Sequence, residues 1–359
     1  SLNERGRAAL VMANSASDAR HSEADIRQSL IENNLIYGML TLPSNMFYTV
    51  TLPATLWFFD KNKADDKLLF IDARNIFTQI DRAHREFNEQ QIHNIAIISK
   101  LHKGNRLAFV RLIDSYITQG IKQLSENQQH IAPISEQLLE VLEDQQGKLA
   151  VGDLVKQWQG LKKLQAAVDN YRIEASAYKG KDDFNVNETN KLQHKLRKKF
   201  DPFFESLHSG LKQLDKIVRH HEKTKAEQAK AANNGKAKRI TADRETKKLK
   251  EALELLHKEI KIAESYHKHI HWLQERFPKA QYEDVTGLCK LASQEEVKEQ
   301  DYSLNPGRYV GVVIEEDGKT EEEFIAGILQ INEEYTLLNQ QAQSLNSVIS
   351  KNLKALCGE

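Results

Sequence analysis

Residues 35–42 read LIYGMLTL and residues 54–60 read ATLWFFD, and these two runs decide how the first part of the chain folds. Both are short, nearly continuous apolar runs that contain β-branched and aromatic residues. Such runs are typical of strands in a sheet that is covered on both faces. Residues 8–12 and 68–71 have the same character, so four strands are expected.

A helix is expected between the first two strands along the chain. Residues 23–32 have apolar side chains at helical spacing behind a serine, a residue type that caps helices: Ile26, Leu30, Ile31 and Ser22. Strands that alternate with a helix predict part of a doubly wound α/β sheet. Only one clear crossover helix is present, and the first strand starts near the beginning of the chain. We therefore expect that another chain, or an earlier part of a longer polypeptide, pairs with this sheet.

From residue 107 onward, helical patterns replace the strand patterns, at 107–117, 138–142, 149–168 and 192–218. Over 247–273, apolar residues at three- and four-residue steps predict the seam of a paired helix: Leu249, Leu253, Leu256, Ile260 and Ala263. Residues 226–240 lie between the last two patterns and include the polar run AANNGKAK. Two long helices joined by a polar tip predict an antiparallel helical hairpin.

The last part of the chain has a strand-like patch at 309–314, an acidic loop, and a long helical pattern over 320–356. A terminal helix of this length favours docking on a partner. The expected fold class is α/β plus mainly α. We expect part of a sheet domain over 1–104, a helical region with the basic hairpin over 105–290, and a C-terminal segment over 291–359.

The 51 basic and 51 acidic residues balance, but the charge is unevenly distributed. Residues 191–250 contain 18 Lys or Arg against 7 Asp or Glu, whereas residues 290–359 contain 6 against 13. A basic segment of this kind either follows nucleic-acid phosphates or is a solvated surface.

The composition also excludes several classes of protein. The two cysteines, Cys289 and Cys357, cannot form a disulfide scaffold, which favours a reducing, cytoplasmic location. No apolar run approaches the ~20 residues of a membrane-spanning helix, so no membrane association is expected. The sequence has no Gly-x-Gly turn and no Gly-x-Ser-x-Gly elbow, which argues against a phosphate cradle or a serine nucleophile in this chain.

Two motifs resemble functional sites, one catalytic and one metal-binding, but helix packing explains their residues better. Residues 201–204, DPFF, resemble the Asp/Asn-Pro-Pro-aromatic motif of amino-methyltransferases, but Phe203 replaces the second proline. We expect Pro202 near the start of a helix, with two aromatic rings facing the core. The histidines at 267, 269 and 271 alternate along a predicted helix without a third converging ligand, so no metal site is expected.

The loop after the strand at 35–42 carries two aromatic residues, Phe47 and Tyr48. They either project from the mouth of an edge hairpin or pack beneath the loop.

Taken together, seven stretches resemble the modification subunit of type I restriction–modification systems. They are GRAALVMAN (6–14), EADIR (23–27), LPSNMF (42–47), LPATLWFFDK (52–61), FIDAR (70–74), DRAHREF (81–87) and YSLNPGRYVG (302–311). The resemblance is specific over 1–104 and 302–311 and weak through the helical middle.

The resemblance implies the C-terminal part of a Rossmann-like methyltransferase sheet and transfer of a methyl group from S-adenosylmethionine to adenine N6 in double-stranded DNA. The cofactor motif and the catalytic motif of that family precede the strand at 8–12, so neither catalytic nor cofactor-binding residues are expected in this chain. We therefore expect a fragment that does not methylate by itself. Phe47 corresponds to the aromatic residue that stacks on the flipped-out base, with Tyr48 as the alternate.

The resemblance also implies a specificity subunit and a restriction subunit as partners. The helix over 320–356 suits docking on the helices of the specificity subunit. The basic hairpin either lies along DNA, through Lys195, Arg197, Lys198 and Lys199, or is solvated. The competing hypothesis is a non-catalytic helical interaction module that retains a sheet fragment.

Overall fold

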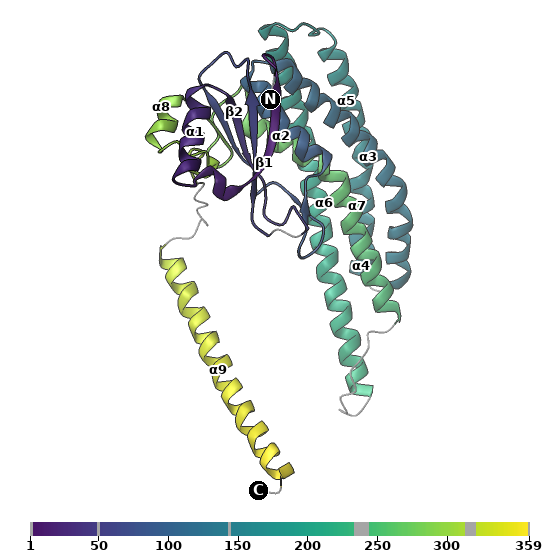
Figure 1. The fold of residues 1–359 in the computed structure, drawn as a ribbon. Helices are drawn as coiled ribbons and strands as arrows, with labels where there is room; N and C mark the ends of the chain where they lie inside the picture. The colour runs from purple at the N-terminus through teal and green to yellow at the C-terminus, as the bar shows by residue number, and fades with distance from the viewer. Residues whose placement is uncertain (1–2, 49–50, 143–144, 233–243, 313–320, 358–359) are drawn as a thin grey trace. The chain divides into compact units, whose positions relative to one another are not determined.

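The protein is described here as a computed structural model that covers residues 3–48, 51–142, 145–232, 244–312 and 321–357 (Figure 1). Two compact units divide the chain, Ser1–Gly311 and Val312–Glu359. The first unit combines a small mixed sheet with long helices, and the second contains the single described helix α9 (Glu321–Cys357).

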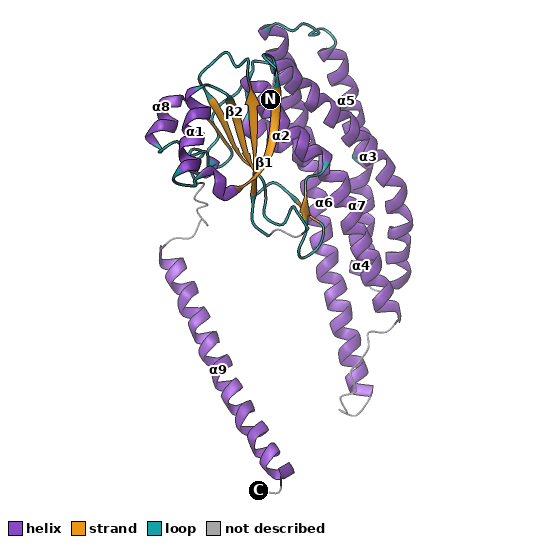
Figure 2. Cartoon of the chain, in the orientation of Figure 1, coloured by secondary structure: helices purple, strands orange, loops and turns teal. Residues whose placement is uncertain are grey.

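The sheet of the first unit has five strands in the order β1-β3-β2-β4-β7 (Figure 2). The strands are β1 (Arg7–Ala13), β2 (Ile36–Thr41), β3 (Ala54–Asp60), β4 (Leu68–Asp72) and β7 (Cys289–Ala292). β2 and β4 are parallel, whereas the pairs β1–β3, β2–β3 and β4–β7 are antiparallel. The four strands predicted from the apolar runs are confirmed, and β7 was not predicted because four residues give too short a pattern.

Helices cover both faces of this sheet (Figure 1). On one face, strand residues such as Leu40 and Ile71 pack with α2 (Glu89–His102) and α3 (Arg106–Val141). On the other, Trp57 and Phe70 pack with α1 (Ser22–Glu32) and α8 (Gln294–Glu299). The inner strands are therefore buried on both sides, which explains their continuous apolar runs.

β1 departs from that expectation. It pairs only with β3 among the described strands, and three of its apolar side chains are 38–56% exposed: Leu10, Val11 and Met12. The prediction that every strand is covered on both faces is thus wrong for β1, because β1 forms the edge of the described sheet.

The helix predicted between β1 and β2 is α1, with two local differences. His21 is its N-cap and makes no side-chain cap hydrogen bond, so Ser22 is the first helical residue and not the cap. Ile26 is 60% exposed, whereas Ile31 is buried.

The strand predicted over 309–314 is also wrong for the part that the structure describes. Residues Pro306–Arg308 form the short 3-10 helix η2, and the ring of Tyr309 stacks on Phe70 with centroids 3.9 Å apart. The apolar run therefore covers a face of the sheet instead of extending it. Residues 313 and 314 and the acidic loop up to 320 lie outside the described residues.

The helical region consists of α3, α4 (Gln145–Gln159), α5 (Leu161–Ala175), α6 (Asp183–Ala232) and α7 (Arg244–Arg276). The five residues of the predicted seam on α7 are all buried: Leu249, Leu253, Leu256, Ile260 and Ala263. None of the helices in the described ranges has the length and hydrophobicity needed to cross a bilayer.

α6 and α7 pack against each other in antiparallel directions. Polar contacts between them recur every seven residues along each helix, from the ion pair Lys250–Glu222 (2.6 Å) through the hydrogen bond His257–Asp215 (2.9 Å) to the hydrogen bond His208–Glu264 (2.9 Å). A seven-residue repeat keeps one face of each helix against the other. The connection at 233–243, which includes most of the predicted polar tip, lies outside the described residues.

Arg106, the first residue of α3, connects three parts of the helical region. Its Nε donates to the carbonyl oxygen of Ala280 (3.0 Å), and its Nη2 donates to the carbonyl of Lys279 (2.9 Å). The same guanidinium contacts Asp183 (2.5 Å) and Asn187 (2.5 Å) near the start of α6. The Arg106 side chain is 11% exposed, whereas that of Asp183 is 81% exposed, so the guanidinium reaches from the packed helices to a surface carboxylate.

Replacing Arg106 with alanine should lower the free energy of unfolding by about 2–3 kcal/mol, because it leaves two carbonyls and a carboxylate without their charged donor. Arg106→Lys should remain destabilised, since an ammonium cannot form the forked contacts. Urea denaturation of the whole chain measures both. Arg111→Ala, on an exposed residue of the same helix, is the control and should change stability by less than about 0.5 kcal/mol. If Arg106→Lys were as stable as the native chain, the forked contacts of the guanidinium would not be needed for stability.

Candidate functional site

The carboxyl ends of β1, β2 and β4 lie at one edge of the sheet, because these three strands run in the same direction. In open α/β sheets, ligands bind at the carboxyl ends of the strands. Three segments begin there: the short helix η1 (Asn14–Ser17), the loop 42–53 and the segment 73–88. This edge is therefore the candidate site.

The last two of these segments are tied together by Arg85. The backbone N–H of Arg85 donates to the carbonyl oxygen of Asn45 (2.9 Å), and its Nη1 donates to the hydroxyl of Ser44 (3.0 Å). The guanidinium also lies 4.0 Å from the ring centroid of Phe77. Asn45 has φ = 61°, a left-handed conformation that asparagine tolerates well. The turn at Ser44 and Asn45 thus has a defined shape, held by the small hairpin of β5 (Thr78–Gln79) and β6 (Arg85–Glu86).

Phe47 and Tyr48 follow this ordered turn and project from the loop. Phe47 is 41% exposed and Tyr48 is 90% exposed, whereas Met46 packs against the core. Of the two arrangements left open by the sequence, the structure therefore has the exposed one. The ring of Tyr48 contacts that of His84, with centroids 4.5 Å apart.

His84 is positioned by Asp81 on the tip of the hairpin. His84 Nδ1 lies 2.7 Å from Asp81 Oδ2, and the backbone N–H of Ala83 donates to Asp81 Oδ1 (2.7 Å). The hydrogen bond from His84, followed by that from Ala83, holds the pKa of Asp81 below its usual range. An ionised carboxylate thus orients the imidazole that meets Tyr48.

The segment 302–311 joins the same edge from the far end of the first unit. Asp18, which follows η1, accepts hydrogen bonds from the Ser303 hydroxyl and from Asn305 Nδ2 (2.9 Å), and Arg308 Nε lies 3.4 Å from it. On the other side, a Cβ atom added to Gly307 would lie 3.2 Å from the Arg74 guanidinium at the end of β4. The resembling stretches 70–74 and 302–311, which are far apart in the sequence, therefore meet in space.

Arg27 of α1 supports this junction from beneath. Its side chain is buried and donates to the carbonyls of Ala16 (3.1 Å) and Tyr302 (3.3 Å). Burial lowers the pKa of the guanidinium, although Asp18 and Glu23 act in the opposite direction. Neither Asp18 nor Arg27 was singled out from the sequence, because their roles depend on residues far along the chain.

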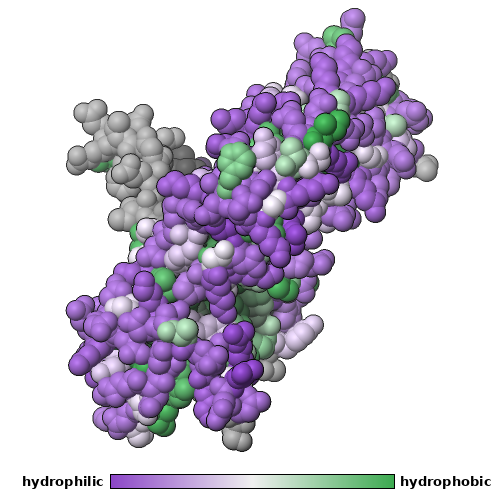
Figure 3. All heavy atoms as spheres, turned by 90° about the horizontal axis from the view of Figure 1, so that it is seen from above, coloured by the Kyte–Doolittle hydropathy of each residue, from purple (hydrophilic) through white to green (hydrophobic). Residues whose placement is uncertain are grey.

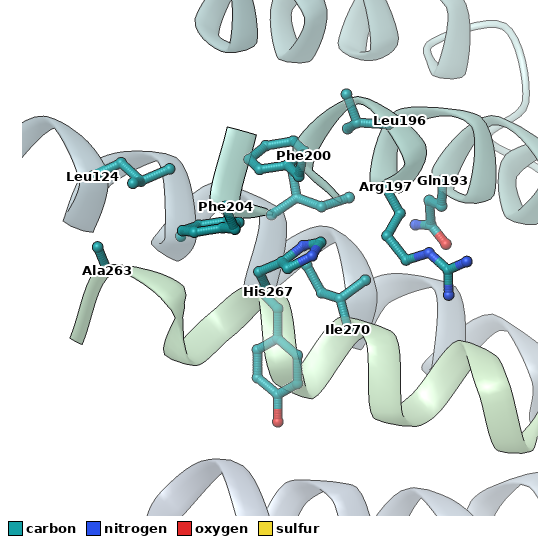
Figure 4. A pocket seen from close by; sticks show the side chains of 12 residues that line it. Leu124, Gln193, Leu196, Arg197, Phe200, Phe204, Ala263, His267 and Ile270 are labelled. Carbon is teal, nitrogen blue, oxygen red and sulfur yellow. The ribbon is translucent and has the colours of Figure 1, made fainter. Parts of the chain in front are cut away.

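The basic run on α6 is divided by the packing. Lys195, Lys198 and Lys199 are exposed, whereas Arg197 is half-buried and turns toward a small pocket among α3, α6 and α7 (Figure 4). The cavity volume of that pocket is about 20 Å³, enough for one water molecule. Arg197 Nε has no hydrogen-bond partner among the described residues.

The two motifs to which the sequence analysis gave a structural role, 201–204 and the histidines at 267–271, lie among the packed helices. Asp201 Oδ1 lies 3.0 Å from His267 Nε2, and the rings of Phe203 and Trp158 stack with centroids 5.6 Å apart. Pro202 lies well inside α6, so its expected place near a helix start is wrong. His269 contacts Asn94 (3.0 Å), and His271 contacts Glu275 (3.7 Å).

The three histidines therefore have three separate partners. The parts of the chain that the structure describes hold no group of three or more metal-ligating side chains.

On the face shown in Figure 3, most of the surface is hydrophilic, with small hydrophobic areas between.

The residues present do not fit S-adenosylmethionine by themselves. The sequence has no Gly-x-Gly turn, and the described sheet ends at the exposed strand β1. A glycine-rich turn is the usual cradle for such a cofactor at the carboxyl edge. No chemical step is therefore assigned to residues of this chain through that cofactor.

Sequence comparison relates the chain to DNA methylases. The family model described as N-6 DNA methylase matches residues 1–119 and 217–318, more than half of the chain. Residues 120–216, which lie in α3, α4, α5 and α6, are outside the match.

Individual relatives match shorter parts. The methylase subunit of the type I restriction enzyme MjaIX from Methanocaldococcus jannaschii is 44% identical over 93 residues, 25% of this chain and 17% of that subunit. The HindI methylase subunit from Haemophilus influenzae is 38% identical over 97 residues, 26% of this chain and 22% of that subunit. The chain thus spans about a fifth of the length of these relatives. A crystal structure of the methyltransferase subunit of a type I restriction–modification system from Streptococcus thermophilus is 26% identical, covers 25% of this chain and 19% of that one, and has a TM-score of 0.25.

Replacing Asp18 with alanine should release the segment 302–311 from the sheet edge, because three donors then lose their common acceptor. Each lost charged hydrogen bond contributes about 1–3 kcal/mol, so the amides of 302–311 should exchange hydrogen roughly 5- to 150-fold faster. Hydrogen-exchange mass spectrometry measures this. Asp25→Ala, at an exposed position on α1, is the control and should leave the exchange unchanged. Equal exchange in Asp18→Ala and the native chain would show that Asp18 does not hold the segment.

Proposed function

Because the chain belongs to the N-6 DNA methylase family, we propose that it forms part of the methylase subunit of a type I restriction enzyme. That subunit would transfer a methyl group from S-adenosylmethionine to adenine N6 in double-stranded DNA. The observation that carries the proposal is the junction at Asp18. It joins the family-matched segments 1–119 and 217–318 at the carboxyl edge of one sheet, although a long helical region separates them in sequence.

The open side of the sheet supports a methylase core that includes further polypeptide. β1 pairs only with β3 in the described part of the chain, and its apolar side chains are exposed on both faces. An exposed edge of this kind is a template for another strand. We propose that further sequence of the methylase, carried on the same or a separate polypeptide, pairs with β1 and supplies the cofactor and catalytic motifs.

Phe47 is the residue of this chain that we assign to the target base. It projects from the carboxyl edge beside Tyr48, on a turn that Arg85 holds in shape. A base that leaves the duplex loses its stacking, and an aromatic ring restores roughly 1–3 kcal/mol of it. Tyr48 remains the alternate, since it is more exposed and its ring already contacts His84.

In the assembled methylase, Phe47→Ala should lower the rate of methyl transfer to duplex DNA by about 5- to 150-fold, which corresponds to the lost stacking. Phe47→Trp should retain most of the rate, because a larger aromatic ring still stacks. Transfer of a labelled methyl group to duplex DNA, with 2-aminopurine fluorescence at the target position, measures rate and base extrusion separately.

Two further variants make this test decisive. Phe184→Ala removes an exposed aromatic ring on α6 and should change neither readout. A larger loss in Tyr48→Ala than in Phe47→Ala would transfer the role to Tyr48, and unchanged rates in both would overturn it. An assembled complex that never methylates DNA would favour the competing function, a non-catalytic helical interaction module.

α9 is the part of the chain that we assign to subunit assembly. Its apolar residues recur at alternating steps of three and four: Ile328, Ile331, Tyr335, Leu338, Ala342, Leu345 and Ile349. These side chains are exposed in the second unit. A strict seven-residue repeat is the signature of a coiled coil, and an exposed seam requires a partner helix. We propose that this seam docks on helices of the specificity subunit, in a complex that the restriction subunit then joins.

Leu338→Asp combined with Leu345→Asp should abolish co-purification with the specificity subunit, because two carboxylates would be buried in an apolar seam. Gln340→Asp combined with Ser347→Asp adds the same charge on the outer face of α9 and should leave assembly intact. Size-exclusion chromatography of co-expressed subunits measures both. Retained assembly in the seam variant would exclude α9 as the docking helix.

A further inference from the structure

One face of α6 carries a line of exposed cations that extends far beyond the basic run at 195–199. Its members form two clusters in which successive cations are three or four residues apart, and fourteen positions separate the clusters: Lys191, Lys195 and Lys198, then Lys212, Lys216, Arg219 and Lys223. We call this set the α6 stripe. Glu205 lies midway between the two clusters, and Asp201 and Asp215 each lie three residues after a member of the stripe.

The stripe lies on the face of α6 that points away from the core. Residues that differ by three, four and seven positions share a side of a helix. The residues on the opposite side, including Leu196, Leu207 and Leu214, are buried in the helical region. The two clusters of the stripe therefore face solvent on the same side of the longest described helix, labelled α6 in Figure 1.

Most of the charge on the stripe is uncompensated. Lys191 forms an ion pair with Glu188 (2.5 Å). The other six cations make neither an ion pair nor a side-chain hydrogen bond within the ranges that the structure covers. Neighbouring cations on α7 differ, since Lys250 is paired with Glu222 and Lys268 with Glu264. Six of the seven cations on the stripe are therefore available to an anionic ligand.

The length of the stripe matches an extended polyanion. Lys191 and Lys223 are 32 positions apart, which corresponds to about 48 Å along the helix axis. Duplex DNA has one phosphate per strand every ~3.4 Å, so this length corresponds to about 14 base pairs. No aromatic or amide side chain interrupts the exposed members of the stripe, so the surface has cations for phosphates and little to read bases.

We propose that the α6 stripe binds the phosphate backbone of duplex DNA without sequence preference. The choice of DNA as the ligand rests on the proposed function. Lys191 to Lys216 lie in the part of the chain outside the family match, so this contact is an addition carried by the helical region. The stripe would hold DNA beside the methylation site and raise the affinity of the enzyme at low salt.

The test measures how DNA binding by the whole chain depends on salt. Lys195, Lys198, Lys212 and Lys216 are replaced by glutamine, and fluorescence anisotropy follows binding to two unrelated duplexes of about 30 base pairs over a range of KCl concentrations. Each phosphate contact contributes about 0.9 to the slope of log K against log salt, so the slope should fall by about 3 to 4 for both duplexes. Affinity at low salt should fall at least tenfold.

The matched control removes the same charge elsewhere. Lys148, Lys162, Lys163 and Lys181 are exposed and lie off the stripe, and their replacement by glutamine should change the slope by less than about 1. Equal losses in the two variants would overturn the proposal in favour of a general charge effect. An unchanged slope with lost binding of a protein subunit would overturn it in favour of an acidic protein partner.

The same variants separate this proposal from the proposed function. Methyl transfer by the assembled complex with an unchanged salt slope would reject the stripe and keep the methylase. A reduced slope in the stripe variant of a complex that does not methylate would keep the stripe and reject the methylase. Circular dichroism melting of each variant identifies any loss of slope that arises from unfolding.

Discussion

The return of the chain to the sheet, through pairing of β7 with β4, is the constraint on which the rest of the structure depends. The helical region leaves the sheet after α2 and comes back through α7, so α3 and α7 must lie side by side. Arg106 fixes this arrangement, because one guanidinium contacts the turn after α7 and the start of α6. An insertion whose two ends are held together can change in length without disturbing the sheet.

The same return brings the segment 302–311 to the carboxyl edge. Asp18 accepts hydrogen bonds from it, and Tyr309 stacks on Phe70 in the sheet. Phe47 projects nearby from a loop that begins at the same edge. The candidate site is thus built from both family-matched segments, while the unmatched helices carry most of the α6 stripe. Under both proposals, methyl transfer would take place at the carboxyl edge of the sheet, and the helical region would contact the DNA backbone.

Local patterns predicted the elements well and the contacts poorly. The inner strands and the seam of α7 were predictable, because burial on both faces or on one stripe leaves a pattern within a few residues. β7 and the strand wrongly expected at 309–314 differ for a physical reason: a short apolar run has the same composition whether it pairs with a strand or covers a face. Arg197 was grouped with its neighbours because it belongs to the same basic run, although its side chain lines the pocket among α3, α6 and α7.

By itself, the sequence determined where the four longer strands and the long helices form, which faces of the helices are apolar, and where charge accumulates. These properties follow from the periodicity of neighbouring residues. Only the tertiary structure decided that Asp18 meets Asn305, that Arg106 meets Ala280, and that β1 is left as an exposed edge. The first two contacts join residues 287 and 174 positions apart, and the third property depends on what lies beside a strand. Local periodicity cannot indicate long-range contacts or the neighbours of a strand, because it depends only on positions a few residues apart.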